Sequence, residues 1–317
     1  MKKLFCLSSI FLFSCLTVFA QRKNTYLIKN NGEYVLKADS ADYFRTVEEP
    51  AKGSSLYLIK EFYINGNRKS VGYSLKIDPP SYEGQNISYF ENGKKKQIAN
   101  YVNGKLSDTV YNYYPNGNIY CVIAYKQGPV GPSIYFKTVK DSTGKDLVTD
   151  GNGEATFFSK DFKYVTEKGT IKNGIYDGTW TGENREHNIT YKENYVNGTL
   201  ISGESKDQDG QTYQYTKPVI PPAFRGGMGK FYQLVAKNVR YPRDAVSRKA
   251  QGIVMIRFTV LKDGTLRGLH PINYADMDLA GEAMRIISTS PVWQPGIYRG
   301  KLVKTTFDLP ISFMLSN

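Results

Sequence analysis

The chain has 317 residues, which allows two or more domains, and 42 Lys and Arg residues against 29 Asp and Glu residues give it a formal net charge of +13. It has two histidines, His187 and His270, and no Ser/His/Asp order, metal-ligand cluster or paired acidic motif, which argues against an enzyme and against a bound metal or cofactor. Beyond residue 20, no apolar stretch is long enough to span a membrane.

Residues 1–20 have the pattern of a signal peptide. Two lysines precede a mostly apolar run of 17 residues that ends at the small residue Ala20, which predicts cleavage before Gln21. A spanning helix needs about 20 apolar residues, and this run contains three serines and a threonine. We therefore expect cleavage and export to the periplasm. Two alternatives to this free form remain, a form anchored in the membrane by the uncleaved segment and a lipoprotein attached through Cys15.

Export bears on the cysteines and on the charge. Cleavage would leave Cys121 as the one cysteine, so no disulfide could form within the chain even in an oxidising compartment.

From Pro222 onward, 14 Lys and Arg residues stand against 6 Asp and Glu residues, a net charge of +8. Outside the cell nucleic acid is scarce, so this charge fits cell-wall polymer, anionic lipid or an acidic receptor segment, or else a solvated basic face.

Residues 24–216 are rich in Tyr, Gly, Asn and Lys, and Asn-Gly pairs punctuate them. An Asn-Gly pair between aromatic segments is a strong signal for a β-hairpin. Asn92 and Asn116 are 24 residues apart, as are Asn173 and Asn197, so a period of about 24 residues, or half of that, is present. The pairs begin at Asn65, Asn92, Asn103, Asn116, Asn152, Asn173 and Asn197. This pattern predicts an all-β region of consecutive hairpins.

Fragments of this region also repeat one another. Residues 101–106 (YVNGKL) match residues 195–200 (YVNGTL), and Gly178-Thr179-Trp180 adds a G-x-W element. On these fragments the region resembles MORN-type repeats, in the degenerate Y-x-N-G form of YwqK-like proteins. The resemblance implies hairpins laid side by side around a thin core of Tyr and Phe. Residues 24–49 are expected to cap the start of the array.

Residues 217–222 contain three prolines and predict a short extended connector. A helix is expected at residues 228–239, because its apolar residues share one face. Alternation then predicts a strand at residues 251–260, and Asp263-Gly264 a tight turn with positive φ. A less regular partner strand is expected at residues 265–272.

The remaining elements complete an α+β domain. Asp276 or Asp278 is expected to cap a helix, which Pro291 ends. The apolar residues on its one face are Leu279, Ala283, Ile286 and Ile287. Residues 293–296 (WQPG) are expected to form a turn, and strict alternation predicts a final strand at residues 305–315.

This order of signals resembles the C-terminal domain of TonB, the protein that couples the inner membrane to outer-membrane transporters. The family shows Y-P-x-x-A before the first strand, G-x-V-x-V-x-F-x-V within it, a D-G turn, W-x-P-G after the helix and P-I-x-F-x-L at the end. The resemblance implies an α+β fold with a helical lead-in followed by β-β-α-β. It also implies a partner, the periplasmic segment of a TonB-dependent outer-membrane transporter, which adds as a strand to the final strand.

The resemblance assigns partner binding to two short segments. The residues are Arg240, Tyr241, Pro242, Thr305, Thr306, Phe307, Asp308, Leu309, Ile311 and Phe313. Pro310 cannot donate a ladder hydrogen bond, so it predicts that the last strand lies at a sheet edge or a bulge. Protection of that edge against aggregation is the alternative role for this proline.

We therefore predict a signal peptide at residues 1–20, a repeat region at 21–216, a connector at 217–222 and a TonB-like domain at 223–317. The predicted function is a periplasmic TonB-like protein that binds transporters by strand addition and supports transmembrane transport. The alternative is a non-energised envelope scaffold that binds peptidoglycan or a partner protein through its repeats. A motor of the ExbB/ExbD type would be a partner of an anchored form, a homodimer stays open, and no nucleic-acid partner is expected.

Overall fold

The computed structural model describes residues 23–128, 131–272 and 276–315, so the predicted signal peptide lies outside the described residues. The chain divides into two compact units, Met1–Asp146 and Leu147–Asn317. The second unit contains the later hairpins together with the C-terminal domain.

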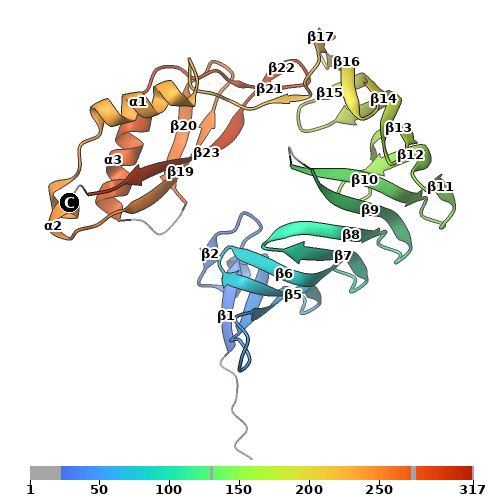
Figure 1. Cartoon of the computed structure of the whole chain (residues 1–317), viewed down its shortest axis with the longest axis horizontal. Coiled ribbons are helices and arrows are strands. Elements are labelled where there is room, and N and C mark those ends of the chain that lie inside the picture. The colour runs from blue at the N-terminus through green and yellow to red at the C-terminus, as the bar shows by residue number, and fades with distance from the viewer. Residues whose placement is uncertain (1–22, 129–130, 273–275, 316–317) are drawn as a thin grey trace, which may run out of the picture. The chain divides into compact units, whose positions relative to one another are not determined.

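The first unit is made of antiparallel strands joined by tight turns (Figure 1). Its elements are β1 (Lys23–Ile28), β2 (Tyr34–Val35), a 3-10 helix η1 (Ala38–Ser40), β3 (Tyr43–Glu48), β4 (Tyr57–Tyr63), β5 (Arg68–Ile77), β6 (Pro80–Tyr89), β7 (Lys95–Val102), β8 (Lys105–Tyr113), β9 (Ile119–Gly128) and β10 (Gly131–Lys140). From β3 to β10 each strand pairs with the next one in the chain, and β1 pairs with β2 and β3.

The turns of this unit explain the period in the sequence. The side-chain amide of Asn92 donates to the carbonyl of Pro115 (2.9 Å), and that of Asn116 donates to the carbonyl of Ser142 (2.7 Å). Each of these turns is therefore bonded to the equivalent turn one hairpin further along. Because a hairpin comprises two strands and two turns, equivalent residues recur after about 24 positions.

The second unit begins with a further series of antiparallel strands. They are β11 (Asp146–Thr149), β12 (Asn152–Phe158), β13 (Val165–Lys172), β14 (Ile175–Asn184), β15 (Ile189–Val196), β16 (Thr199–Asp207) and β17 (Thr212–Tyr215). Each pairs with its neighbour in sequence from β11 to β17. Together with the first unit, this series confirms the predicted all-β hairpin region.

In this series a glycine lies opposite an aromatic residue on the neighbouring strand. Gly169 pairs with Trp180, and Gly182 pairs with Tyr191. A Cβ atom at Gly169 would stand 2.4 Å from the Trp180 ring, so any side chain there would displace it. Trp180 is fully buried and stacks on Tyr176 at a centroid distance of 3.7 Å. Glycines thus make room for the thin aromatic core.

One predicted turn is wrong. Asn152 and Gly153 lie in β12, and the turn before that strand is made by Asp150 and Gly151, which both have positive φ. Positive φ at both residues of the pair does occur at Asn103-Gly104, Asn173-Gly174 and Asn197-Gly198. An Asp-Gly pair serves the same hairpin geometry as Asn-Gly, and it stands just before the misread pair.

The C-terminal domain has the predicted α+β order. Its helices are α1 (Met228–Asn238), α2 (Arg243–Ser247) and α3 (Met277–Ser288), and its main sheet has the order β20 (Leu266–Pro271), β19 (Gly252–Val260), β23 (Thr305–Phe313). Figure 1 shows the two longer helices, α1 and α3, beside this sheet. Among the described residues, a cluster of buried side chains forms the core, and it includes Phe231 of α1, Phe258 of β19 and Trp293. Asp276, rather than Asp278, is the N-cap of α3.

A second, smaller sheet was not predicted. It has the order β18 (Val219–Ile220), β21 (Gly296–Tyr298), β22 (Lys301–Val303), so the predicted connector contains a paired strand. The predicted turn at residues 293–296 is wrong, because Gln294 forms a β-bridge with Ala223 and Gly296 begins β21. The turn lies instead at Arg299-Gly300, where both residues have positive φ. Arg-Gly is not among the pairs that favour such a turn in a sequence, so the sequence offered little signal.

Candidate functional site

The strand β23 forms one edge of the main sheet in the described part of the chain. It pairs with β19 over nine residues without a shift in register, from Thr305 opposite Val260 to Phe313 opposite Gly252. Pro310 lies within the strand opposite Met255, and its side chain is exposed. The edge position that Pro310 predicted is therefore present, without a bulge between these two strands.

The direction of the peptide groups along β23 follows from one hydrogen bond. Ile272 donates its N–H to the carbonyl of Met255 (2.9 Å), so the peptide groups of Met255 point towards β20. Residues of an antiparallel pair alternate between facing the partner and facing away. Pro310, opposite Met255, therefore directs its backbone outwards, as do Thr306, Asp308 and Ser312 along the strand. The open edge therefore offers three N–H donors, and at Pro310 the fourth donor is missing.

The predicted site residues of β23 thus fall into two groups. Thr306 and Asp308 direct their peptide groups to the open edge. The remaining five direct their peptide groups to β19, and three of them have buried side chains in the core. These five are Thr305, Phe307, Leu309, Ile311 and Phe313. Partner binding by any of these residues stays a prediction.

The other predicted segment lies at the Phe313 end of the strand. The Tyr241 ring packs edge-on against Phe313 at 5.8 Å, and its hydroxyl donates to the carbonyl of Ala250 (2.5 Å). The N–H of Arg240 donates to the carboxylate of Glu282 (2.7 Å). Pro242 is the N-cap of the short helix α2. The structure therefore brings this segment to the final strand, where Tyr241 has a structural role.

A pocket opens at the other end of β23. Its volume is about 470 Å³, and we call it the Thr306 pocket. Its walls come from β18, the β21–β22 hairpin, the start of β23 and the turn between β14 and β15, and they include His187, Val219, Ile220, Ile297, Tyr298 and Thr306. All of these residues belong to the second unit.

Comparison with known proteins identifies the C-terminal part of the chain. The family model described as Gram-negative bacterial TonB protein C-terminal matches residues 237–315. This part of the chain is a TonB C-terminal domain. Among solved structures, the chain is similar to the solution structure of the Helicobacter pylori TonB C-terminal domain, at 21% identity over 28% of this chain and 81% of that chain, with a TM-score of 0.24. The comparison with curated proteins finds no match.

The TonB C-terminal domain is joined to the last hairpins through its unpredicted β21–β22 hairpin. At the tip, Arg299 Nε donates to Glu193 Oε1 of β15 at 2.9 Å, and the Glu193 side chain is fully buried. Glu193 also accepts from the hydroxyls of Tyr195 (3.0 Å) and Tyr215 (2.8 Å). The Arg299 guanidinium lies 3.5 Å from the centroid of the Tyr191 ring. This buried cluster is the main feature that sequence reasoning missed.

The surroundings of Arg299 stabilise its charged form. Burial opposes the charge of Arg299, but the hydrogen bonds to Glu193, together with electrostatic attraction from Glu193 and the neighbouring tyrosines, outweigh this effect and raise the pKa of Arg299. Nearby, Lys301 pairs with Asp207 at 3.2 Å. Burial acts to raise the pKa of Asp207, but hydrogen bonds from Lys301 and Tyr213 outweigh it, and the pKa lies below its usual value. The charges on both sides of this contact are therefore paired at neutral pH.

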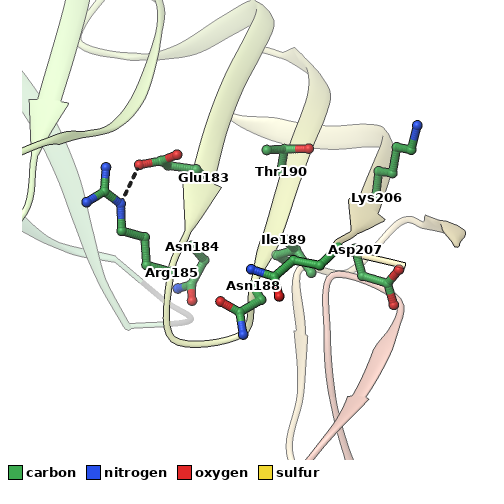
Figure 2. A pocket seen from close by; sticks show the side chains of 9 residues that line it. Glu183, Asn184, Arg185, Asn188, Ile189, Thr190, Lys206 and Asp207 are labelled. Atoms are coloured by element: carbon green, nitrogen blue, oxygen red, sulfur yellow. Dashed lines mark hydrogen bonds and ion pairs between the residues drawn. The ribbon is translucent and has the colours of Figure 1, made fainter. Parts of the chain in front are cut away.

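A second pocket, of about 220 Å³, lies at the end of the β14–β15 hairpin. Figure 2 shows Glu183 and Arg185 joined on one side of it, at 2.8 Å, and Lys206 pointing away from them on the other. Asp207, which also lines it, is already paired with Lys301. Three of its four charged side chains, Glu183, Arg185 and Asp207, are thus already paired, which makes it the weaker candidate site.

Within residues 23–128, 131–272 and 276–315, no group of three or more His, Cys, Asp or Glu side chains could hold a metal ion. Over the same ranges, no helix is long and apolar enough to cross a membrane.

Proposed function

We propose that this protein binds the periplasmic segment of TonB-dependent outer-membrane transporters and thereby supports transmembrane transport. The segment is an extended peptide that adds as a strand to the open edge of β23. Proteins with a TonB C-terminal domain take part in transport interactions in the cell envelope, and this domain is the family match on which the proposal rests. The observation that carries the mode of binding is the outward direction of the peptide groups of Thr306, Asp308 and Ser312.

Strand addition suits this edge for two reasons. First, main-chain hydrogen bonds supply affinity without a particular peptide sequence, while alternate side chains set the register. Second, the exposed face of the sheet beside this edge carries Asp308 of β23 paired with Arg257 of β19, and their side chains meet at 2.7 Å and are partly exposed. Pro310 removes one donor, so a bound strand leaves one carbonyl to water, which costs little at an exposed edge.

We further propose that the protein acts in the periplasm after removal of residues 1–20. The proposal is supported by the sequence pattern of that segment and by the family of the C-terminal domain. Mass spectrometry of the protein from cells is expected to find Gln21 at the N-terminus. A lipid on Cys15 or an intact residue 1–20 segment would contradict free release, and the intact segment would favour an anchored form.

The test of strand addition uses the full chain and fluorescein-labelled peptides that copy the periplasmic N-terminal segments of outer-membrane transporters from the same cell. We expect Thr306→Pro to weaken binding at least about tenfold. This substitution removes an outward N–H and no bond to β19, and Pro310 shows that the strand accommodates proline at such a position. Thr306→Ala, which keeps the N–H, is the matched control and is expected to bind as well as the unaltered chain.

Peptide chemistry provides an independent arm. N-methylation at every second residue of a peptide removes the N–H donors from one of its two edges only. Of two peptides, one methylated at the odd positions and one at the even positions, one is therefore expected to lose binding and the other to keep it. Equal binding in both phases, or equal binding to Thr306→Pro and Thr306→Ala, would rule out strand addition. Sedimentation with peptidoglycan but no peptide binding would favour the scaffold role of the repeats.

A further inference from the structure

The Thr306 pocket adjoins the open edge of β23. Thr306 belongs to both, because its peptide group faces the edge and its side chain lines the pocket. Thr259, its partner on β19, also lines the pocket, so the pocket extends over the face of the sheet opposite the core, while Thr305 lines it at the end of the strand. Residues directly opposite each other on neighbouring strands have their side chains on the same face. A strand added beside β23 therefore directs the side chain opposite Thr306 towards this pocket.

We infer that the Thr306 pocket receives one large apolar side chain, such as Leu or Phe, of the peptide bound along β23. This inference rests on the proposed strand addition and assigns the specificity of that site. The walls carry Val219 and Ile220, which are 60% and 41% exposed, together with Ile297. The volume of about 470 Å³ falls within the range of roughly 300–1,000 Å³ of ligand pockets. The rest of the lining is polar and includes Glu186, His187 and Lys304, so an apolar side chain is favoured against the part of the wall that Val219, Ile220 and Ile297 form.

The walls of the pocket are held in place by contacts within the second unit. The Tyr298 hydroxyl accepts a hydrogen bond from the side-chain amide of Asn184 (3.2 Å), and the Tyr298 ring lies 4.5 Å from that of His187. The next residue, Arg299, is bonded to Glu193. The β14–β15 turn and the β21–β22 hairpin therefore form a preformed site, so less ordering opposes binding. The last hairpins of the repeat region thus contribute directly to partner recognition.

The matched pair of variants is Ile220→Glu and Leu302→Glu. Both residues lie opposite Ile297 in the small sheet, one on each side, and they are 41% and 44% exposed. Ile220 lines the pocket, whereas Leu302 does not. Each variant adds the same charge at a similar exposure. A difference in peptide affinity between the two variants is therefore due to the position of Ile220 in the pocket.

The probe is the tightest-binding of the fluorescein-labelled transporter peptides, together with copies in which each large apolar residue is replaced singly by Ala. We expect Ile220→Glu to weaken binding of the parent peptide about 10- to 100-fold, the effect of losing one buried Leu or Phe side chain. Leu302→Glu is expected to leave binding unchanged. One Ala-substituted peptide is expected to bind equally weakly to the unaltered chain and to Ile220→Glu.

Disulfide trapping provides the second readout. A peptide with Cys at the sensitive position is expected to cross-link to Ile220→Cys and not to Leu302→Cys. If the unaltered chain binds the peptide through β23 but Ile220→Glu binds it equally well, the pocket inference is wrong and strand addition stands. If no transporter peptide binds the unaltered chain, both are wrong.

Discussion

Arg299 Nε lies 2.9 Å from Glu193 Oε1, although the two residues are 106 positions apart in the chain. Their side chains are 10% and 0% exposed. Arg299 belongs to the TonB C-terminal domain and Glu193 to the hairpin series, so one buried ion pair joins the two parts of the second unit. The domain is therefore attached to its neighbours by more than the covalent connector.

We expect Arg299→Ala to destabilise this contact by about 3–5 kcal/mol, because it leaves the carboxylate of Glu193 buried without its cation. The chain has two tryptophans, Trp180 in the hairpin series and Trp293 in the C-terminal domain, so fluorine NMR of 5-fluorotryptophan protein follows each part separately. In urea, the two signals are expected to change together in the unaltered chain and at separate concentrations in Arg299→Ala.

The control is Lys163→Ala, since Lys163 pairs with Asp161 at an exposed site and such pairs contribute about 0–1 kcal/mol. The double variant Glu193→Leu with Arg299→Met is expected to recover most of the lost stability, because apolar pairs replace buried ion pairs at little cost. Coincident transitions in Arg299→Ala would show that other contacts hold the two parts together.

Asp276 and Asp278 both bond to Arg248, at 2.9 and 2.6 Å, but only Asp276 accepts from the N–H groups at the start of α3. We therefore expect Asp276→Ala to reduce the free energy of unfolding of the C-terminal domain by about 1 kcal/mol, and Asp278→Ala by clearly less. Urea unfolding followed at Trp293 measures both. Equal losses would show that the contact with Arg248, and not the cap, provides the stability.

Pro310→Ala restores an outward N–H on the open edge of β23. If the edge receives a peptide, the new hydrogen bond is expected to tighten binding of transporter peptides by about 0.5–1.5 kcal/mol, or roughly 2- to 12-fold. Fluorescence anisotropy measures this change, and Ser312→Ala, on the same edge with its N–H kept, is the control. Unchanged peptide binding together with dimers or aggregates in sedimentation velocity would instead assign Pro310 a protective role.

The Asp207–Lys301 pair predicts a dependence of stability on acid. The pKa of Asp207 is lower in the folded chain than its ordinary value of 3.8, so the pair stabilises the folded state above that value and loses this effect as the pH falls through the lowered pKa. Between about pH 5 and about pH 3, the urea midpoint at Trp180 is therefore expected to fall more steeply in the unaltered chain than in Asp207→Asn. Parallel curves would show that other carboxylates control the acid response.

Much of the fold could be read from the sequence, because local rules decide it. Alternation placed Val254, Ile256 and Phe258 on the buried face of β19, since a strand has a period of two residues whatever it packs against. Six of the seven Asn-Gly pairs lie at hairpin turns, because these residues tolerate positive φ. The TonB C-terminal domain, its helices and its edge strand β23 follow from such local signals in a fixed order.

Tertiary structure alone decided the site. The Thr306 and Asp308 peptide groups point outwards because β23 pairs with β19 on one side only, and this pairing joins segments that are far apart in the chain. The Arg299–Glu193 pair and the walls of the Thr306 pocket join segments that lie far apart in the chain. A buried charge is stable only where other groups complete its hydrogen bonds, and two of the groups that do so for Glu193, Tyr215 and Arg299, are brought to it by the folded chain.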